Sequence, residues 1–113
     1  MSETEPPQVL ALVRDLMFSS KITATARAEG VNVRIIRDGS KLGQETGNRL
    51  LVDLNQDGAI EAATEWKTRT GGRVIGFVSH VDAATIAQAR DAGFDQVLAR
   101  SRFVESLPDL LKG

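Results

Sequence analysis

Four polar residues that suit phosphate or metal chemistry each follow a short apolar run of this 113-residue chain: Asp15, Asp53, Ser79 and Arg100. Two carboxylates supply the oxygen ligands that Mg²⁺ prefers in proteins. A hydroxyl group and a guanidinium group can hold the oxygens of a phosphate. This chemistry requires all four side chains at one place, so the elements that carry them decide whether they can act together.

Short runs rich in Val, Ile and Leu predict five β-strands, at residues 9–13, 31–36, 49–54, 73–78 and 95–99. Stretches with helical spacing lie between and after these runs. The clearest is the last, where Phe103, Leu107, Leu110 and Leu111 fall on one face of a helix. Residues 39–47 predict a short second helix flanked by loops. The candidate N-caps of the helices are Ser19 or Ser20, Asp57 and Asp82.

Strand and helix alternate five times, which predicts an α/β fold with a parallel sheet covered on both faces. The most economical arrangement is a flavodoxin-like, doubly wound, five-stranded parallel sheet with strand order 2-1-3-4-5 and about five helices. Residues 9–113 then form a single domain, and residues 1–8 form a flexible N-terminal tail. Ligands of such sheets bind beyond the carboxyl ends of strands one and three, and the four polar residues lie at this rim.

The rim residues resemble those of response-regulator receiver domains, which are chemotaxis-receiver-like domains of two-component signalling. The resemblance spans nearly the whole chain from Val9 onward. Asp53 matches the phosphoacceptor aspartate, and Asn55 matches the residue whose backbone carbonyl reaches the metal. Ser79 matches the switch serine or threonine, and Arg100 falls where the family has a lysine. The stretches at residues 79–82 and 100–103 are also similar to those of small bacterial receiver-like proteins.

The resemblance implies a mechanism in which Asp53 attacks a phosphohistidine or a small phosphodonor. Mg²⁺ would be held by Asp15, Asp53 and the backbone carbonyl of Asn55, and Ser79 and Arg100 would hold the phosphoryl group. The implied protein partners are a histidine kinase or an output protein. The expected function is that of a stand-alone, atypical receiver in bacterial signal transduction, not of a metabolic enzyme.

Departures from the family pattern leave a second state open. Arg14 replaces the first acid of an acidic pair, and its positive charge opposes a divalent cation, so we expect weak Mg²⁺ binding. Arg100 has a planar fork that could instead hold Asp53 through two hydrogen bonds. Ser101 replaces the usual proline. These changes also fit a pseudo-receiver, whose fixed shape is read by a partner protein without phosphorylation.

Composition excludes several other classes of function. The 14 basic and 15 acidic residues leave a formal charge of -1, so the chain has no excess positive charge to bind nucleic acid. It has no cysteine, which excludes disulfides and thiolate metal sites and fits a reducing cytoplasm. Its apolar runs are far shorter than the roughly 20 residues of a membrane helix. The single histidine, His80, borders the rim.

Two alternatives remain open at the same rim. One is a small-ligand-binding flavodoxin-like module that holds a nucleotide or a flavin at the crevice. The other is a calcium-binding loop, since residues 53–60 match the opening of an EF-hand loop. That loop requires a glutamate at its twelfth position, where this chain has Thr64, and Glu65 comes one place late.

Overall fold

The computed structural model describes residues 9–79 and 82–113, so the predictions for the tail at residues 1–8 and for His80 lie outside the described residues. Within the described ranges, strands and helices alternate along the chain. They are β1 (Val9–Leu12), α1 (Leu16–Glu29), β2 (Val33–Ile36), η1 (Gly39–Gln44), β3 (Arg49–Asp53), α2 (Ala59–Thr70), β4 (Arg73–Val78), α3 (Ala83–Asp91), β5 (Gln96–Ala99) and α4 (Arg100–Lys112).

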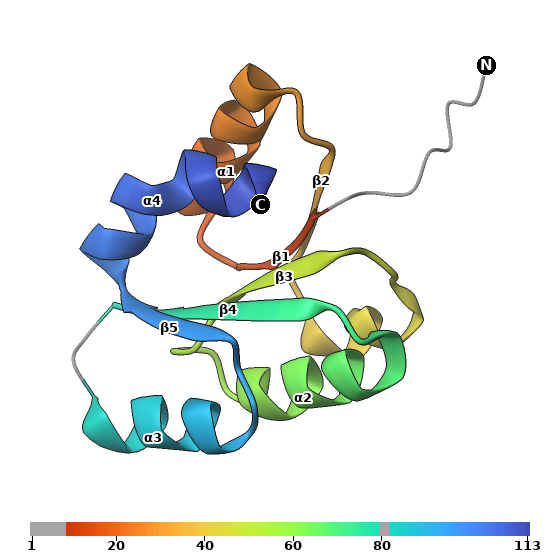
Figure 1. Cartoon of the computed structure of the whole chain (residues 1–113), viewed down its shortest axis with the longest axis vertical. Helices are drawn as coiled ribbons and strands as arrows, with labels where there is room; N and C mark the ends of the chain where they lie inside the picture. The colour runs from red at the N-terminus through yellow and green to blue at the C-terminus, as the bar shows by residue number, and fades with distance from the viewer. Residues whose placement is uncertain (1–8, 80–81) are drawn as a thin grey trace.

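The five strands form one parallel sheet with the order β2-β1-β3-β4-β5, which confirms the predicted flavodoxin-like topology. Figure 1 shows α1 and α4 on one side of the sheet and α2 and α3 on the other. The central strands are apolar on both faces because each face is covered. Leu10 and Leu50 belong to the core under η1, α2 and α3, whereas Val9 and Ala11 belong to the core under α1 and α4.

The second helical element is a six-residue 3-10 helix, η1, which confirms a short second helix within residues 39–47. Two glycines in this segment disfavour a longer α-helix. Gly39 also lets η1 approach α2 closely, because a Cβ at this position would lie 3.1 Å from the Cβ of Ala62. The connection between β2 and β3 is therefore packed closely against the next helix.

The apolar face predicted for the last helix is confirmed in α4. Phe103, Leu107 and Leu111 are buried, and Leu110 packs against the same core. The guanidinium of Arg49, at the start of β3, donates hydrogen bonds to the carbonyl oxygens of Leu110 and Leu111, at 3.4 and 2.9 Å. These bonds satisfy carbonyls of the last helical turn, which have no partners within the helix.

The N-cap of α1 is Asp15, and the prediction of Ser19 or Ser20 was wrong. The Asp15 carboxylate accepts a hydrogen bond from the backbone N–H of Phe18 at 3.1 Å. Ser19 lies within the first turn, where its hydroxyl donates to the carbonyl of Leu16. A carboxylate that was assigned to a metal therefore also begins a helix.

Of the other two predicted caps, one is confirmed and one is wrong. Asp82 caps α3 by accepting from the backbone N–H groups of Ala84 and Thr85. The N-cap of α2 is Gly58, with a positive φ of 76°, rather than Asp57. Glycine takes this left-handed conformation without a side-chain clash, which places the turn one residue later than predicted. In the described parts of the chain, no helix is long and apolar enough to cross a membrane.

Candidate functional site

The parallel sheet places the four candidate residues at its carboxyl edge. Asp53 is the last residue of β3, Ser79 directly follows β4, and Arg100 directly follows β5. Asp15 follows β1, which lies next to β3 in the sheet. At this edge, the ion pair and hydrogen bonds of the described residues form two separate groups: Asp15 with Arg100, and Asp53 with Asn55 and Ser79.

The first group joins the start of α4 to the start of α1. The Nη2 atom of Arg100 lies 3.8 Å from Oδ2 of Asp15, and these side chains are 44% and 48% exposed. At such exposure an ion pair contributes about 0–1 kcal/mol. The guanidinium carbon of Arg100 also lies 4.5 Å from the centre of the Phe18 ring, which adds a cation–π attraction.

Phe18 is itself fixed by a cluster of buried aromatic rings. Its ring centre lies 4.9 Å from that of Phe77 and 5.8 Å from that of Phe103. The rings of Phe77 and Phe103 stack at 4.3 Å. The platform under Arg100 is therefore built from α1, β4 and α4, and it directs the guanidinium toward α1.

The ion pair of Arg100 differs from the possibility that its planar fork holds Asp53. Across the described residues, the ion pair of Arg100 is made with Asp15. The reason is the ring of Phe18, which lies beside the start of α4 and attracts the guanidinium. The cation of this edge therefore contacts the helix cap rather than the candidate phosphoacceptor.

The second group ties two loops together. Oδ1 of Asp53 accepts a hydrogen bond from the backbone N–H of Asn55 at 3.0 Å, which forms an Asx turn. Oδ1 of Asn55 accepts from the backbone N–H of Ser79 at 2.7 Å. From the sequence, only the backbone carbonyl of Asn55 was expected to take part, and the role of its side chain was not predicted. The sequence signal for this role of the side chain is an asparagine two residues after an aspartate that ends a strand.

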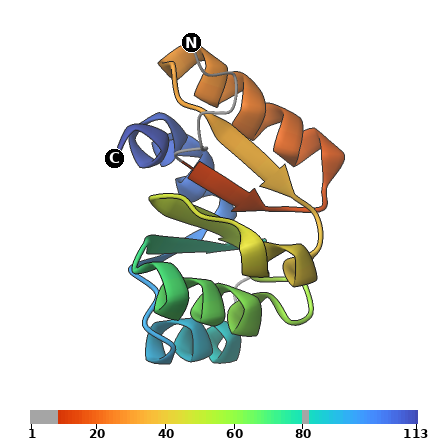
Figure 2. The same cartoon turned by 90° about the vertical axis from the view of Figure 1, so that its right-hand side faces the viewer.

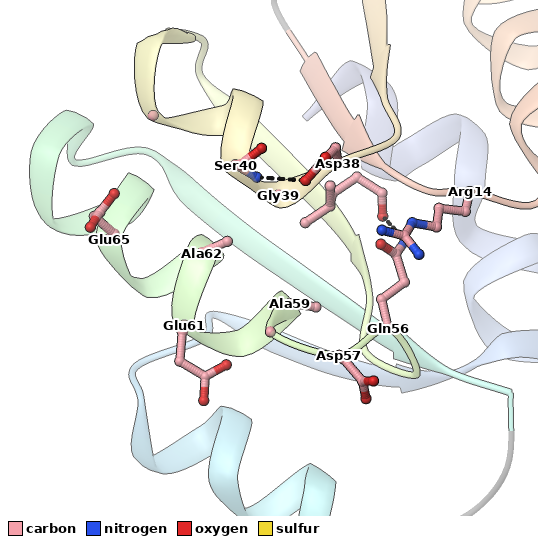
Figure 3. Close-up of a pocket in the computed structure, with 13 residues that line it drawn as sticks. Arg14, Asp38, Gly39, Ser40, Gln56, Asp57, Ala59, Glu61, Ala62 and Glu65 are labelled. Carbon is pink, nitrogen blue, oxygen red and sulfur yellow. Dashed lines mark hydrogen bonds between the residues drawn. The ribbon is translucent and has the colours of Figure 1, made fainter.

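Arg14 is anchored toward β2. Its Nε atom donates to the carbonyl of Arg37 at 3.0 Å, and Nη2 of Arg37 donates to the carbonyl of Arg14 at 3.4 Å. The guanidinium lines a cavity next to Gln56, as Figure 3 shows. The cation in contact with Asp15 is consequently Arg100 and not Arg14.

The oxygen donors at this edge suit Mg²⁺ by type, since Mg²⁺ keeps several waters and needs only one or two carboxylates. Both carboxylates already have protein partners: Asp15 caps α1 and pairs with Arg100, and one oxygen of Asp53 accepts from Asn55. Residues 9–79 and 82–113 contain no group of three or more His, Cys, Asp or Glu side chains placed to hold a metal ion. An Mg²⁺ ion bound at these carboxylates would have to compete with these contacts.

A cavity of about 320 Å³ lies between η1, α2 and the end of β1, and the sequence analysis did not predict it. Figure 3 shows Arg14 and Gln56 at one end of it and Glu65 at the other. Small residues after β2 and β3 leave room for the cavity: Gly39, Gly43, Gly58, Ala59 and Ala62. Their clustering was the sequence signal that could have predicted it. None of the described residues that line it is aromatic, which disfavours a flavin.

Asp38, which also lines this cavity, is a stable anion. The backbone N–H and the hydroxyl of Ser40 donate hydrogen bonds that lower the pKa of the Asp38 carboxyl, and the charges of Arg14 and Lys41 lower it further. The carboxylate is therefore ionised throughout the neutral range, and it offsets part of the positive charge at the end of β2.

The calcium-loop alternative does not fit the fold. Asp53 ends strand β3, whereas an EF-hand loop follows an entering helix. At the twelfth position, Thr64 lies within α2, where its hydroxyl donates to the carbonyl of Ile60 at 2.7 Å. The matching residues 53–60 thus form a strand end and a turn into a helix.

No protein-family model matches the sequence, and no curated protein matches it. Solved structures do. A response regulator from Burkholderia pseudomallei, whose structure contains a phosphorylated aspartic acid, a calcium ion and citrate, is 21% identical with a TM-score of 0.77. That match covers 91% of this chain and 65% of the longer chain.

Two further structures match along almost their whole length. A CheY-like receiver domain protein from Methanospirillum hungatei JF-1 has a TM-score of 0.75 at 17% identity, covering 96% of this chain and 98% of that one. The BeF3-activated DrrB receiver domain has a TM-score of 0.80 at 15% identity, covering 96% of both chains. The fold of this chain is therefore that of the response-regulator receiver domains.

Proposed function

We propose that this chain is an atypical receiver domain in signal transduction that acts by binding a protein partner. The observation that carries the proposal is the position of Arg100, which is paired with Asp15 and seated on Phe18. In this position the guanidinium is part of the α1–α4 contact. The arrangement supports a pseudo-receiver, in which a fixed shape rather than a phosphoryl group is recognised.

Phosphorylation of Asp53 remains the finer alternative within this function. The residues that would serve it are Asp53 as acceptor, Ser79 and Arg100 for the phosphoryl oxygens, and Asp15 and the Asn55 carbonyl for Mg²⁺. To take part, Arg100 must leave Asp15 and Phe18, and Mg²⁺ must compete with Arg100 for Asp15. Both requirements lower the yield of phosphorylated protein.

The surface that we assign to the partner lies at the start of α1. Leu16 is 63% exposed and Met17 is 84% exposed, and these are the large exposed apolar side chains of the described residues. A flexible thioether suits a surface that adapts to another protein. Asp15 and Arg100 lie beside this apolar pair and supply charges of both signs. A histidine kinase or an output protein is the partner class that this function requires.

The mass of the intact protein after incubation with Mg²⁺ and acetyl phosphate tests the phosphorylation branch. We expect little or no phosphorylated wild-type protein. The variant Arg14→Asp adds a carboxylate beside Asp15 and should raise the yield, because the metal neutralises charge as the phosphoryl group is transferred. Asp53→Asn in the same background should abolish the mass increase. Complete phosphorylation of the wild-type protein would refute the fixed pseudo-receiver.

The surface at the start of α1 is tested by measuring the affinity of this chain for kinases and output proteins that are encoded near its gene. Met17→Asp should weaken binding at least about tenfold, because it places a charge in the apolar contact. Arg90→Asp, an exposed change on α3, is the matched control. Equal loss of binding in both variants would remove the assignment of this surface.

A further inference from the structure

Within residues 9–79 and 82–113, β2 is the outermost strand of the sheet and pairs with β1 alone (Figure 2). The backbone N–H groups of Val9 and Val13 donate to the carbonyls of Asn32 and Ile36, at 3.2 and 3.0 Å. Because the backbone groups of successive residues in a strand alternate between its two sides, the N–H and C=O groups of Val33 and Ile35 face away from β1. No strand of the described residues pairs with this side of β2, so these groups form an edge onto which another strand can add.

A groove of about 260 Å³ runs along this strand and is walled by η1. Arg69 of α2 fixes the wall by donating to the carbonyls of Leu42 and Glu45, at 3.0 and 2.7 Å. The wall of the groove is therefore held in place by hydrogen bonds from α2. From β2 the groove takes Arg34, Ile35 and Ile36, which corresponds to about 10 Å of extended chain.

The charges in the groove are unbalanced. Glu45 is paired with Arg34 at 3.4 Å, and the carboxylate of Asp38 accepts the Ser40 N–H at the start of η1. Arg37 and Lys41 are exposed and also line the groove. The charged lining residues are thus three cations (Arg34, Arg37 and Lys41) and two anions (Asp38 and Glu45), so the groove is net positive in a chain whose overall charge is -1.

We propose that the β2 edge is a docking strand for an acidic, extended segment of a partner protein. The outward backbone groups of Val33 and Ile35 suit a partner in strand conformation, and the net positive lining of the groove favours acidic side chains in it. A second copy of this chain is disfavoured, because edge-to-edge pairing of two β2 strands brings the arginines of both copies together. This surface is separate from the α1 surface and does not depend on Asp53.

The test uses two acetylated and amidated peptides, one of alternating glutamate and valine and one of alternating lysine and valine, each five residues long. The acidic peptide should bind at least about tenfold more tightly, and added salt should weaken it. It should also slow hydrogen exchange at the backbone amides of Val33 and Ile35. The double variant Arg37→Glu/Lys41→Glu should weaken its binding about tenfold or more.

The control is Arg90→Glu/Arg102→Glu, which reverses two exposed cations on α3 and α4 and should leave peptide binding unchanged. Circular dichroism of both double variants verifies that the fold is kept. Equal binding of the lysine peptide would overturn the proposal. Unchanged exchange at Val33 and Ile35 would also overturn it, as would a dimer in sedimentation that protects these same amides.

Discussion

The guanidinium of Arg100 lies 3.8 Å from the carboxylate of Asp15, the N-cap of α1. Both side chains lie at the edge of the sheet where a receiver would place its metal. A divalent cation held by the Asp15 carboxylate would compete with this ion pair. Arg100→Ala should therefore raise the affinity for Mg²⁺ several-fold, measured by the shifts of the Asp53 and Asn55 amide signals during a Mg²⁺ titration. Arg102→Ala, an exposed change two residues further along α4, should leave the affinity unaltered. An affinity unchanged by Arg100→Ala would mean that this pair is not the barrier.

The hydrogen bond from the Ser79 N–H to Asn55 predicts a local effect. Asn55→Ala removes the acceptor, so exchange of the Ser79 amide should become faster and the free energy of unfolding should fall by about 0.5–1.5 kcal/mol. Asn55→Asp keeps a side-chain oxygen at the same place and should retain most of the protection. Hydrogen exchange at Ser79 in the three proteins measures this, and identical rates would exclude a tether between the two loops.

Asp95 predicts a pH dependence of stability. Burial raises the pKa of its carboxyl, but hydrogen bonds from Lys67 at 2.8 Å and from the Val74 N–H at 2.7 Å outweigh this and lower the pKa below its ordinary value. A carboxyl with a lower pKa in the folded state stabilises the protein above its unfolded pKa, and the contribution is lost as the pH falls through the folded pKa. Asp95→Ala should cost about 1–3 kcal/mol at pH 7.

The difference between wild-type protein and Asp95→Ala should shrink as the pH is lowered below about 4. Urea unfolding at several pH values measures it. Asp91→Ala, at the exposed end of α3, serves as the comparison, since no hydrogen bond or ion pair is described for its side chain. A difference that stays constant from pH 7 to about pH 2 would show that Asp95 acts through packing rather than through its charge.

Gly72 predicts a steric effect. A Cβ at this position would collide with the ring of Trp66, which is buried and cannot move aside. Gly72→Ala should lower the free energy of unfolding by about 1–3 kcal/mol. Gly43→Ala, where a Cβ meets nothing within 4 Å, should change it by less than about 1 kcal/mol. Urea unfolding followed by circular dichroism measures both, and equal effects would contradict the collision.

The sheet could be predicted from sequence because its strands are short, apolar and separated by helical spacing. Leu10, Leu50 and Val74 are all buried, as a parallel sheet with two covered faces requires. The placement of Asp53, Ser79 and Arg100 after their strands followed from that topology alone. These are backbone properties, which depend on patterns that extend over many residues.

The contacts of the site could not be predicted, because they depend on neighbours that are distant in sequence. Arg100 turns toward Asp15 because the ring of Phe18 lies under it, and Phe18 is placed by Phe77 and Phe103. Aspartate is typical both of a helix N-cap and of a metal ligand, so the residue type of Asp15 does not tell these two roles apart. The sequence pattern indicates which groups reach the edge, whereas packing decides which of them meet.

Trp66 gives the chain a built-in optical probe. It is the single tryptophan, the chain has no tyrosine, and within the described residues its indole N–H is buried without a hydrogen-bond partner. Near-ultraviolet absorbance and emission therefore report almost wholly on one ring, packed between α2 and the sheet. The emission of the native protein should lie at short wavelengths and shift to the red on unfolding, so peptides and partners that lack tryptophan can be added without obscuring the signal.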